Sequence, residues 1–182
     1  LYQVEPWFMG LANSNVNDSE LSIAMKSLAQ FHNASRQVHL EVKTPPTIAR
    51  RLQRLSELSA ITESQIRRLA AKSQNALQER LAAIAPDVCR SFHRLSRQLE
   101  LQLKSIQQDR LEITPCLRDI WHAHVLFGND GSVSLVDYGA MNLDYFGTDV
   151  ARLVGSYVGD DIKRWNLALD CYWHFRSANS DS

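Results

Sequence analysis

The sequence predicts an α+β fold that is mostly α, with one central β-hairpin. Apolar residues recur at helical spacing in four stretches, 21–31, 47–60, 63–84 and 87–110. Two short apolar runs, Val125–Phe127 and Val133–Val136, flank the sequence Gly-Asn-Asp-Gly-Ser at 128–132, which is typical of a hairpin loop. We therefore expect helices to surround a single hairpin.

The segment 117–139 carries acidic and imidazole side chains at the two ends of this hairpin. Asp119 precedes the first strand and Asp137 ends the second. Because a hairpin brings these ends together, Asp119, His122, His124 and Asp137 can share one small site. Neighbouring carboxylates repel each other unless a cation or a proton lies between them. The combination predicts a functional site, although any one of these residues alone would fit an ordinary polar loop.

The same segment resembles the catalytic core of the kinase-like aminoglycoside and choline phosphotransferases. Their pattern is His-Gly-Asp, four further residues, Asn, a strand, a turn, a second strand and Asp-Phe-Gly. Here Leu117-Arg118-Asp119 is followed by His124, the two strand candidates and Asp137-Tyr138-Gly139. Asp149 stands where the family has an Asp-Leu-Ala at the start of a helix. The resemblance implies the C-terminal lobe of a protein-kinase-like fold.

By this resemblance Asp119 is the catalytic base. It would accept the proton of a small-molecule hydroxyl while the γ-phosphoryl group of ATP, or of another nucleoside triphosphate, is transferred. Asp137 and His124 are the implied metal ligands, and Asp149 is implied to support the backbone of the catalytic loop. The family has Asn where this chain has His124. Magnesium prefers oxygen ligands and imidazole suits softer ions, so manganese is an alternative to magnesium here.

The resemblance also implies how the chain is organised. Residues 1–10 match the hinge between the two lobes, where Val4 and Glu5 would lie along the adenine, with Leu126 beneath it. The N-terminal lobe is expected upstream of Leu1, so these 182 residues alone are expected to turn over little nucleotide. Within a single C-terminal lobe of residues 1–182, a helical insert at 47–110 is expected to influence the choice of acceptor.

Composition argues against several other classes of partner. Acidic and basic residues balance at 20 each, which does not favour a nucleic acid or a membrane surface. The arginines of the 47–110 region are diluted by acidic residues and lack interleaved aromatics, so they predict a solvated face. No apolar stretch is long enough to cross a bilayer. Three scattered cysteines, Cys89, Cys116 and Cys171, favour reduced thiols in the cytoplasm. Nothing indicates an oligomeric state.

Several local features predict where the elements begin and end. Residues 1–10 form a short strand that breaks at Pro6. Asp18 or Ser19 caps the first helix, and His32 ends it as a packed or capping residue. Thr62 is expected to cap a helix, and Pro86 to lie in the first turn of the next one. An irregular loop is expected at 140–148, and Thr148 or Asp149 is expected to cap a helix that runs to about Tyr157. Asp161 is expected to cap the last helix.

Two alternative functions follow from the same residues. A kinase-like scaffold or interaction module with impaired catalysis is favoured by His124 and by the missing first lobe. A metal-dependent hydrolase would instead use His122 and His124 as zinc ligands together with Asp137. That second alternative requires the strand to begin already at His122, because only then do both imidazoles point the same way.

Overall fold

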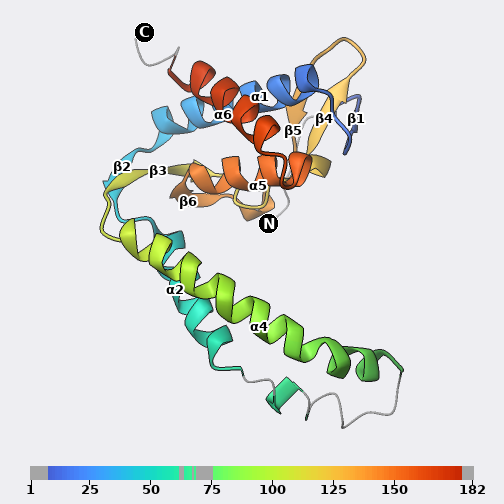
Figure 1. The fold of residues 1–182 in the computed structure, drawn as a ribbon. Helices are drawn as coiled ribbons and strands as arrows, with labels where there is room; N and C mark the ends of the chain where they lie inside the picture. The colour runs from blue at the N-terminus through green and yellow to red at the C-terminus, as the bar shows by residue number, and fades with distance from the viewer. Residues whose placement is uncertain (1–7, 62–63, 67, 69–75, 178–182) are drawn as a thin grey trace. The chain divides into compact units, whose positions relative to one another are not determined.

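The computed structural model describes residues 8–61, 64–66, 68 and 76–177 (Figure 1). The chain forms two units. One consists of residues 1–43 and 111–182, and the other of residues 44–110. The second unit covers the helical stretch predicted at 47–110. Val4, Glu5 and Thr62 lie outside the described residues, so the predictions made for them are not addressed by the structure.

Helix α1 (Asp18–Val38) begins with a reciprocal cap. The Asn17 side chain accepts the backbone N–H of Glu20 at 3.0 Å, and the Glu20 carboxylate accepts the N–H of Asn17 at 2.8 Å. The cap is therefore Asn17, not Asp18 or Ser19. The prediction that His32 ends the helix is also wrong. The buried face continues from Leu28 through His32 to Ser35, so the helix runs six residues further.

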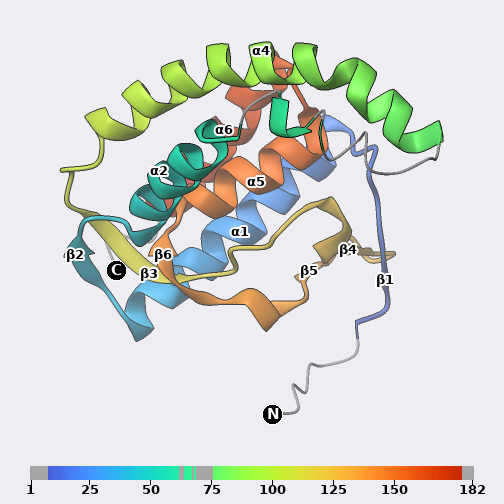
Figure 2. The same cartoon turned by 90° about the horizontal axis from the view of Figure 1, so that it is seen from below.

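Two further helices complete the helical layer of this unit. Helix α5 (Gly147–Val158) lies against α6 (Ile162–Ser177), and α1 and α6 lie side by side (Figures 1 and 2). Asp161 caps α6 as predicted, since its carboxylate accepts the N–H groups of Lys163 and Arg164. Helix α5 instead begins after Phe146, which places Thr148 and Asp149 inside the first turn. The core between these helices includes Leu21, Met25, Leu28, Leu153, Val154 and Tyr172.

The predicted hairpin is confirmed. Strands β4 (Val125–Gly128) and β5 (Val133–Leu135) pair antiparallel, with Val125 opposite Leu135. The turn closes with Gly131 at φ +79°, a conformation that glycine adopts without the steric cost of a side chain. Strand β1 (Gly10–Ala12) pairs with the outer side of β4. Gly10 thus begins a strand, whereas the sequence predicted that it would close one.

A second three-stranded sheet was not predicted. Strand β3 (Leu111–Cys116) lies between β2 (Glu41–Lys43) and β6 (Asn142–Tyr145). The irregular loop expected at 140–148 is therefore wrong for 142–145, because these residues pair with β3, whose position in the chain is distant. Pro115 is tolerated because β2 covers only Leu111–Ile113, which leaves β3 a single neighbour at the proline.

The second unit contains helices α2 (Pro46–Ser59) and α4 (Ala76–Ser105), which pack against each other. Pro86 lies inside α4, so the prediction that it begins a new helix is wrong. A proline inside a helix removes one backbone hydrogen bond, and α4 continues through Pro86 without interruption. The described part of the stretch expected at 63–84, from Ala76 on, is joined across this residue to the stretch expected at 87–110, which remains helical only to Ser105.

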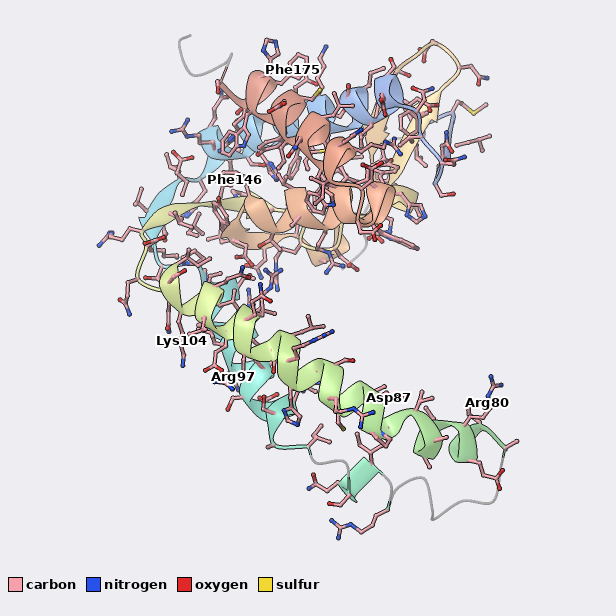
Figure 3. All side chains as sticks on the ribbon, in the orientation of Figure 1. Arg80, Asp87, Arg97, Lys104, Phe146 and Phe175 are labelled. Atoms are coloured by element: carbon pink, nitrogen blue, oxygen red, sulfur yellow. The ribbon has the colours of Figure 1, made fainter. Side chains whose placement is uncertain are left out.

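The exposed surface of α4 carries charged side chains, as Figure 3 shows for Arg80, Asp87, Arg97 and Lys104, and also apolar ones such as Leu95. Lys104 pairs with Glu100 one turn away, at 2.6 Å. The charged side chains of α4 are thus exposed to solvent, as the sequence predicted. Among the helices in the described part of the chain, none combines the length and the apolar character that crossing a membrane requires.

Candidate functional site

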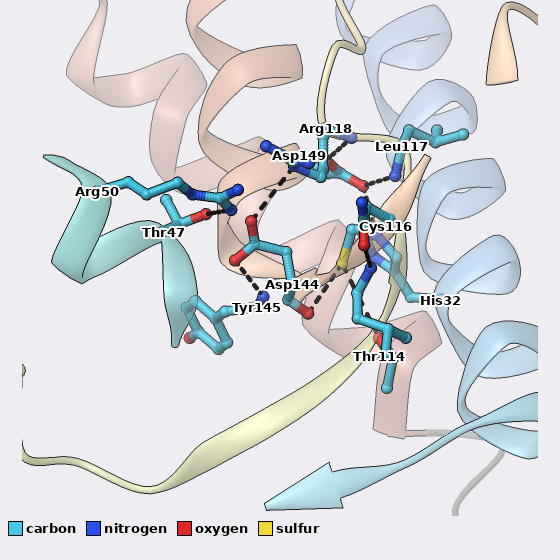
Figure 4. Close-up of polar contacts among 12 residues, drawn as sticks. His32, Thr47, Arg50, Thr114, Cys116, Leu117, Arg118, Asp144, Tyr145 and Asp149 are labelled. Carbon is cyan, nitrogen blue, oxygen red and sulfur yellow. Dashed lines mark hydrogen bonds and ion pairs between the residues drawn. The ribbon is translucent and has the colours of Figure 1, made fainter. Parts of the chain in front are cut away.

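The backbone that carries Asp119 is held by the carboxylate of Asp149. The N–H groups of Leu117 and Arg118 each donate to Asp149 at 2.7 Å, and the carboxylate is fully buried (Figure 4). Arg118 has φ +65°, a conformation that costs a non-glycine residue energy. Two hydrogen bonds to a buried charge offset that cost. Asp149 therefore fixes the direction in which the chain enters Asp119.

Asp149 is itself oriented by α1 and α6. Nε2 of His32 lies 3.1 Å from its Oδ2, and Nδ1 of His32 lies 2.8 Å from the hydroxyl of Tyr172. A carboxylate only accepts, so Nε2 carries the proton and the tyrosine hydroxyl donates to Nδ1. Burial lowers the pKa of His32, against the opposing effect of Asp149. The imidazole is therefore neutral.

Sequence reasoning missed this role of His32. It placed the residue at a helix end, although His32 is four residues after Leu28 and continues the apolar face of the helix. A histidine on a buried face needs partners for both ring nitrogens. That requirement was the available signal, but the partners, Asp149 and Tyr172, are more than 100 residues away in sequence.

Arg118 and Cys116 tie the same loop to β6. The guanidinium of Arg118 lies 3.4 Å from the buried carboxylate of Asp144, and the Cys116 thiol donates to the carbonyl of Asp144 at 3.2 Å (Figure 4). Burial raises the pKa of Cys116 to about 12, so the thiol stays protonated. Cys116 also lies close to His32 and Asp149. Because all three side chains are already hydrogen bonded, we assign them to a polar core that supports the loop.

The two predicted carboxylates line one pocket. A cavity of about 570 Å³ is lined by seven residues, Asp119, Ile120, Trp121, His124, Asp137, Arg152 and Ser156. The side chains of Asp119 and Asp137 are each 60% exposed, so both are accessible from the cavity. Arg152 from α5 forms an ion pair with Asp119. Sequence reasoning did not anticipate Arg152, which lies three residues beyond Asp149 and hence one turn along the helix.

Asp137 follows β5 in a left-handed backbone conformation, φ +66°. Among the described residues other than glycine, only Arg118 and Asp137 have positive φ, and each lies next to or within the pocket. Strained backbone of this kind is common at functional sites, where the surrounding structure maintains it. The carboxylate of Asp137 also accepts the N–H of Gly139 at 3.4 Å.

The two histidines before β4 differ in their surroundings. Residues His122–His124 form a 3₁₀ turn, and the strand begins only at Val125. His124 reaches the pocket, where Nε2 lies 3.4 Å from Oδ2 of Asp137. His122 is not among the residues lining the pocket and packs near Trp121 and Tyr157. The strand geometry that the hydrolase alternative requires is therefore absent from this turn.

A second hollow, of about 610 Å³, lies at the outer side of β1 and β4 and is lined by Phe8–Asn13, Glu20, Phe127 and Asn129. Leu126, the predicted floor of an adenine site, lies in β4 opposite Ala12 and Ser134. Successive strand residues point to opposite faces of a sheet, and Leu126, unlike Phe127, is not among the residues that line the hollow. The two residues thus offer an apolar side chain on each face of this sheet.

Comparison with known proteins gives a structural match only. No family model matches the chain, and no curated protein matches it significantly in sequence. Spectinomycin phosphotransferase APH(9)-Ia, solved with ADP and spectinomycin, superposes with a TM-score of 0.58 at 17% identity, over 94% of this chain and 54% of its own. A glucosamine kinase solved with glucosamine, ADP and inorganic phosphate superposes with a TM-score of 0.52 at 14% identity, over 87% and 40%. Crystal form A of glucosamine kinase superposes with a TM-score of 0.50 at 15% identity, over 85% of this chain and 41% of its own.

The chain has the fold of a kinase-like lobe. The mostly helical architecture with small antiparallel sheets, predicted from sequence, is confirmed by these matches. The chain spans 40–54% of the length of the solved proteins that it resembles in these comparisons. At such low identity the likeness establishes the fold alone.

Proposed function

We propose that the intact protein is a phosphotransferase that moves the γ-phosphoryl group of a nucleoside triphosphate to a hydroxyl of a small molecule. The observation that carries this proposal is the shared pocket of Asp119 and Asp137 within a kinase-like fold. Phosphoryl transfer depends mainly on positioning and on neutralising charge, so two carboxylates on separately anchored loops are the parts that it requires.

Asp119 serves as the base. Its exposed carboxylate can accept the proton of an acceptor hydroxyl that enters the pocket, while Asp149 holds the preceding two peptide groups in place. Arg152 fixes the carboxylate from the side of α5. A base restrained at both its backbone and its side chain presents one orientation to the acceptor, which is how enzymes lower the entropic part of the barrier.

Asp137 is the proposed metal ligand. Its exposed carboxylate offers the oxygen atoms that magnesium prefers, and the ion would neutralise the phosphate charges of a bound nucleotide such as ATP. The resemblance also implied His124 as a ligand, and its Nε2 lies 3.4 Å from Oδ2 of Asp137, which is the reason to test manganese as well as magnesium. Leu126 is proposed to lie beneath the adenine, with Val4 and Glu5 along the hinge.

The acceptor is proposed to be a small polar molecule with a free hydroxyl. The structural neighbours were solved with glucosamine and with spectinomycin, which are both of this kind. The free thiols of Cys89, Cys116 and Cys171 agree with the proposal of a reducing compartment such as the cytoplasm. Because the neighbours are about twice as long, activity is proposed for a longer protein that also supplies a nucleotide-covering lobe.

Coupled measurement of ADP formation tests the proposal. The 182-residue chain and the same chain extended by its upstream coding sequence would be assayed with ATP, Mg²⁺ or Mn²⁺, and a panel of amino sugars, aminocyclitols and amino alcohols. We expect acceptor-dependent ADP formation by the extended protein and little by the shorter one. Asp119→Asn should abolish it, whereas Asp170→Asn, at an exposed position on α6, should not. Equal turnover by Asp119→Asn would reject Asp119 as the base.

The ion pair between Arg152 and Asp119 also favours a second candidate, a kinase-like module that binds partners without transferring phosphate. In that case the carboxylate would be engaged by Arg152 instead of by an acceptor. Titration of ATP with Mg²⁺ into the extended protein separates the candidates when combined with the turnover assay. Nucleotide binding without transfer to any acceptor, in wild type and in Arg152→Gln alike, would support the non-catalytic module.

A further inference from the structure

Two hydrogen bonds determine the tautomer of His124. The indole Nε1–H of Trp121 donates to Nε2 of His124 at 2.8 Å, and Nδ1 of His124 lies 2.9 Å from the backbone carbonyl of Asp119. An indole N–H can only donate and a carbonyl oxygen can only accept. Nδ1 therefore carries the proton, and Nε2 has a lone pair that the indole already occupies.

The position of that lone pair matters because Nε2 lies 3.4 Å from Oδ2 of Asp137. Since Nε2 has no proton, this contact is not an ion pair. Two ligands of one ion, each about 2.1 Å from it, lie roughly 3.0–3.4 Å apart. The spacing would thus allow His124 and Asp137 to share a metal. However, the indole N–H of Trp121 donates to the same lone pair of Nε2 that a metal ion would need.

We propose that Trp121 caps His124 and thereby keeps imidazole nitrogen out of the metal site. The metal that Asp137 binds is then surrounded by oxygen atoms from this carboxylate, water and phosphate, which suits a hard cation such as Mg²⁺. His124 instead closes the catalytic loop by donating to the carbonyl of Asp119. The inference rests on the proposed function only in taking Asp137 as the carboxylate that faces the metal.

The substitution Trp121→Phe tests this proposal. The Trp121 side chain is exposed, so Trp121→Phe keeps an aromatic ring at this position at little cost to folding, while it removes the N–H donor together with part of the ring system. Trp173→Phe is the matched control, since Trp173 is exposed to a similar degree and does not line the pocket. The double variant Trp121→Phe/His124→Asn removes the imidazole itself.

The probe is Mn²⁺ alone, bound to the 182-residue chain at saturating concentration, so the result does not depend on phosphotransfer. Electron spin echo envelope modulation detects a directly bound imidazole nitrogen. We expect no imidazole signal in wild type or Trp173→Phe, a clear signal in Trp121→Phe, and its loss in the double variant. Mn²⁺ should bind Trp121→Phe about tenfold more tightly than wild type.

Three results would overturn the proposal. They are an imidazole signal already present in wild type, the lack of a signal in Trp121→Phe, and equal Mn²⁺ affinity in these two proteins. Long-range ¹H–¹⁵N correlation of the metal-free wild type provides an independent check. It should show His124 protonated at Nδ1, and protonation at Nε2 would contradict the cap whatever the metal data show. A phosphotransfer assay that failed would leave this result unaffected.

Discussion

His32 and Asp149 form a hydrogen-bonded pair in which neither side chain is exposed to solvent, with Nε2 of His32 3.1 Å from Oδ2 of Asp149. The pair joins α1 to α5 across 117 residues of sequence, and Asp149 in turn holds the loop that precedes Asp119. It is the part of the site on which stability and proposed function both depend, and it leads to the first two predictions.

The protein should lose stability on mild acidification through His32. Burial lowers the pKa of His32 in the folded chain below its value of about 6.5 in the unfolded chain, so the unfolded state binds more protons below that pH. The stabilising effect is therefore complete above about pH 6.5 and declines as the pH falls toward the folded-state pKa, by at most about 1.4 kcal/mol per pH unit. Urea unfolding at pH 7.5, 6.5 and 5.5 measures it. His32→Gln should flatten the decline relative to His93→Gln, whose histidine is exposed; parallel curves for the two variants would contradict the prediction.

Asp149→Asn should loosen the loop that carries Asp119. The amide has one oxygen in place of two, so one of the two backbone N–H groups, of Leu117 or Arg118, loses its acceptor. A hydrogen bond to a buried charge contributes about 1.5–3 kcal/mol. We expect a loss of that size in the free energy of unfolding, together with faster hydrogen exchange at Leu117 and Arg118. Asp160→Asn, at an exposed position, should change neither. Unchanged hydrogen exchange at Leu117 and Arg118 in Asp149→Asn would show that the loop keeps its conformation without the two bonds to Asp149.

Two buried tyrosines should respond oppositely to loss of the hydroxyl. Tyr172→Phe leaves Nδ1 of His32 without a donor and should cost about 1–3 kcal/mol. The hydroxyl of Tyr157 is buried without a hydrogen-bond partner among the described residues, so Tyr157→Phe should be neutral or slightly stabilising. Urea midpoints of the two variants give the comparison directly. A larger loss in Tyr157→Phe than in Tyr172→Phe would refute it.

Two glycines should likewise respond in opposite directions to alanine. Gly131→Ala should destabilise the hairpin by about 1–2 kcal/mol because a Cβ at φ +79° meets the backbone of its own residue, although no other atom lies within 4 Å of it. Gly155→Ala, inside α5, should stabilise by about 0.5–1 kcal/mol, since the added methyl meets only Trp165 at 3.6 Å. Thermal unfolding ranks the variants, and a stable Gly131→Ala protein would mean that the turn rearranges.

Arg152→Gln should separate stability from the proposed activity. The ion pair with Asp119 is about half exposed on both sides, and such pairs contribute at most about 1 kcal/mol to stability. Loss of the guanidinium, however, frees the Asp119 carboxylate to rotate, so kcat of the extended protein should fall about tenfold while its Tm changes little. Arg97→Gln, on the exposed face of α4, is the control. A kcat equal to that of the control would leave Arg152 without a positioning role.

What the sequence determined by itself is local. The hairpin at 125–135 follows from two apolar runs around a turn containing Gly131, and the capping of α6 follows from Asp161. The presence of Asp119 and Asp137 in one pocket follows from the hairpin, because it brings residues on either side of the turn together. In each case the residues that decide the outcome are within about 20 positions of each other, so their pattern is visible in the chain.

Only the tertiary structure decided the rest. Residues 142–145 become a strand because β3 offers them backbone partners, and nothing in their own sequence demands it. His32 becomes a buried imidazole with partners for both ring nitrogens because Asp149 and Tyr172 lie beside it on helices α5 and α6. The tautomer of His124 depends on where the Trp121 indole points, which is a matter of side-chain packing. Hydrogen bonds of this kind require that each donor find one acceptor in space, and the order of residues along a chain does not specify that distance.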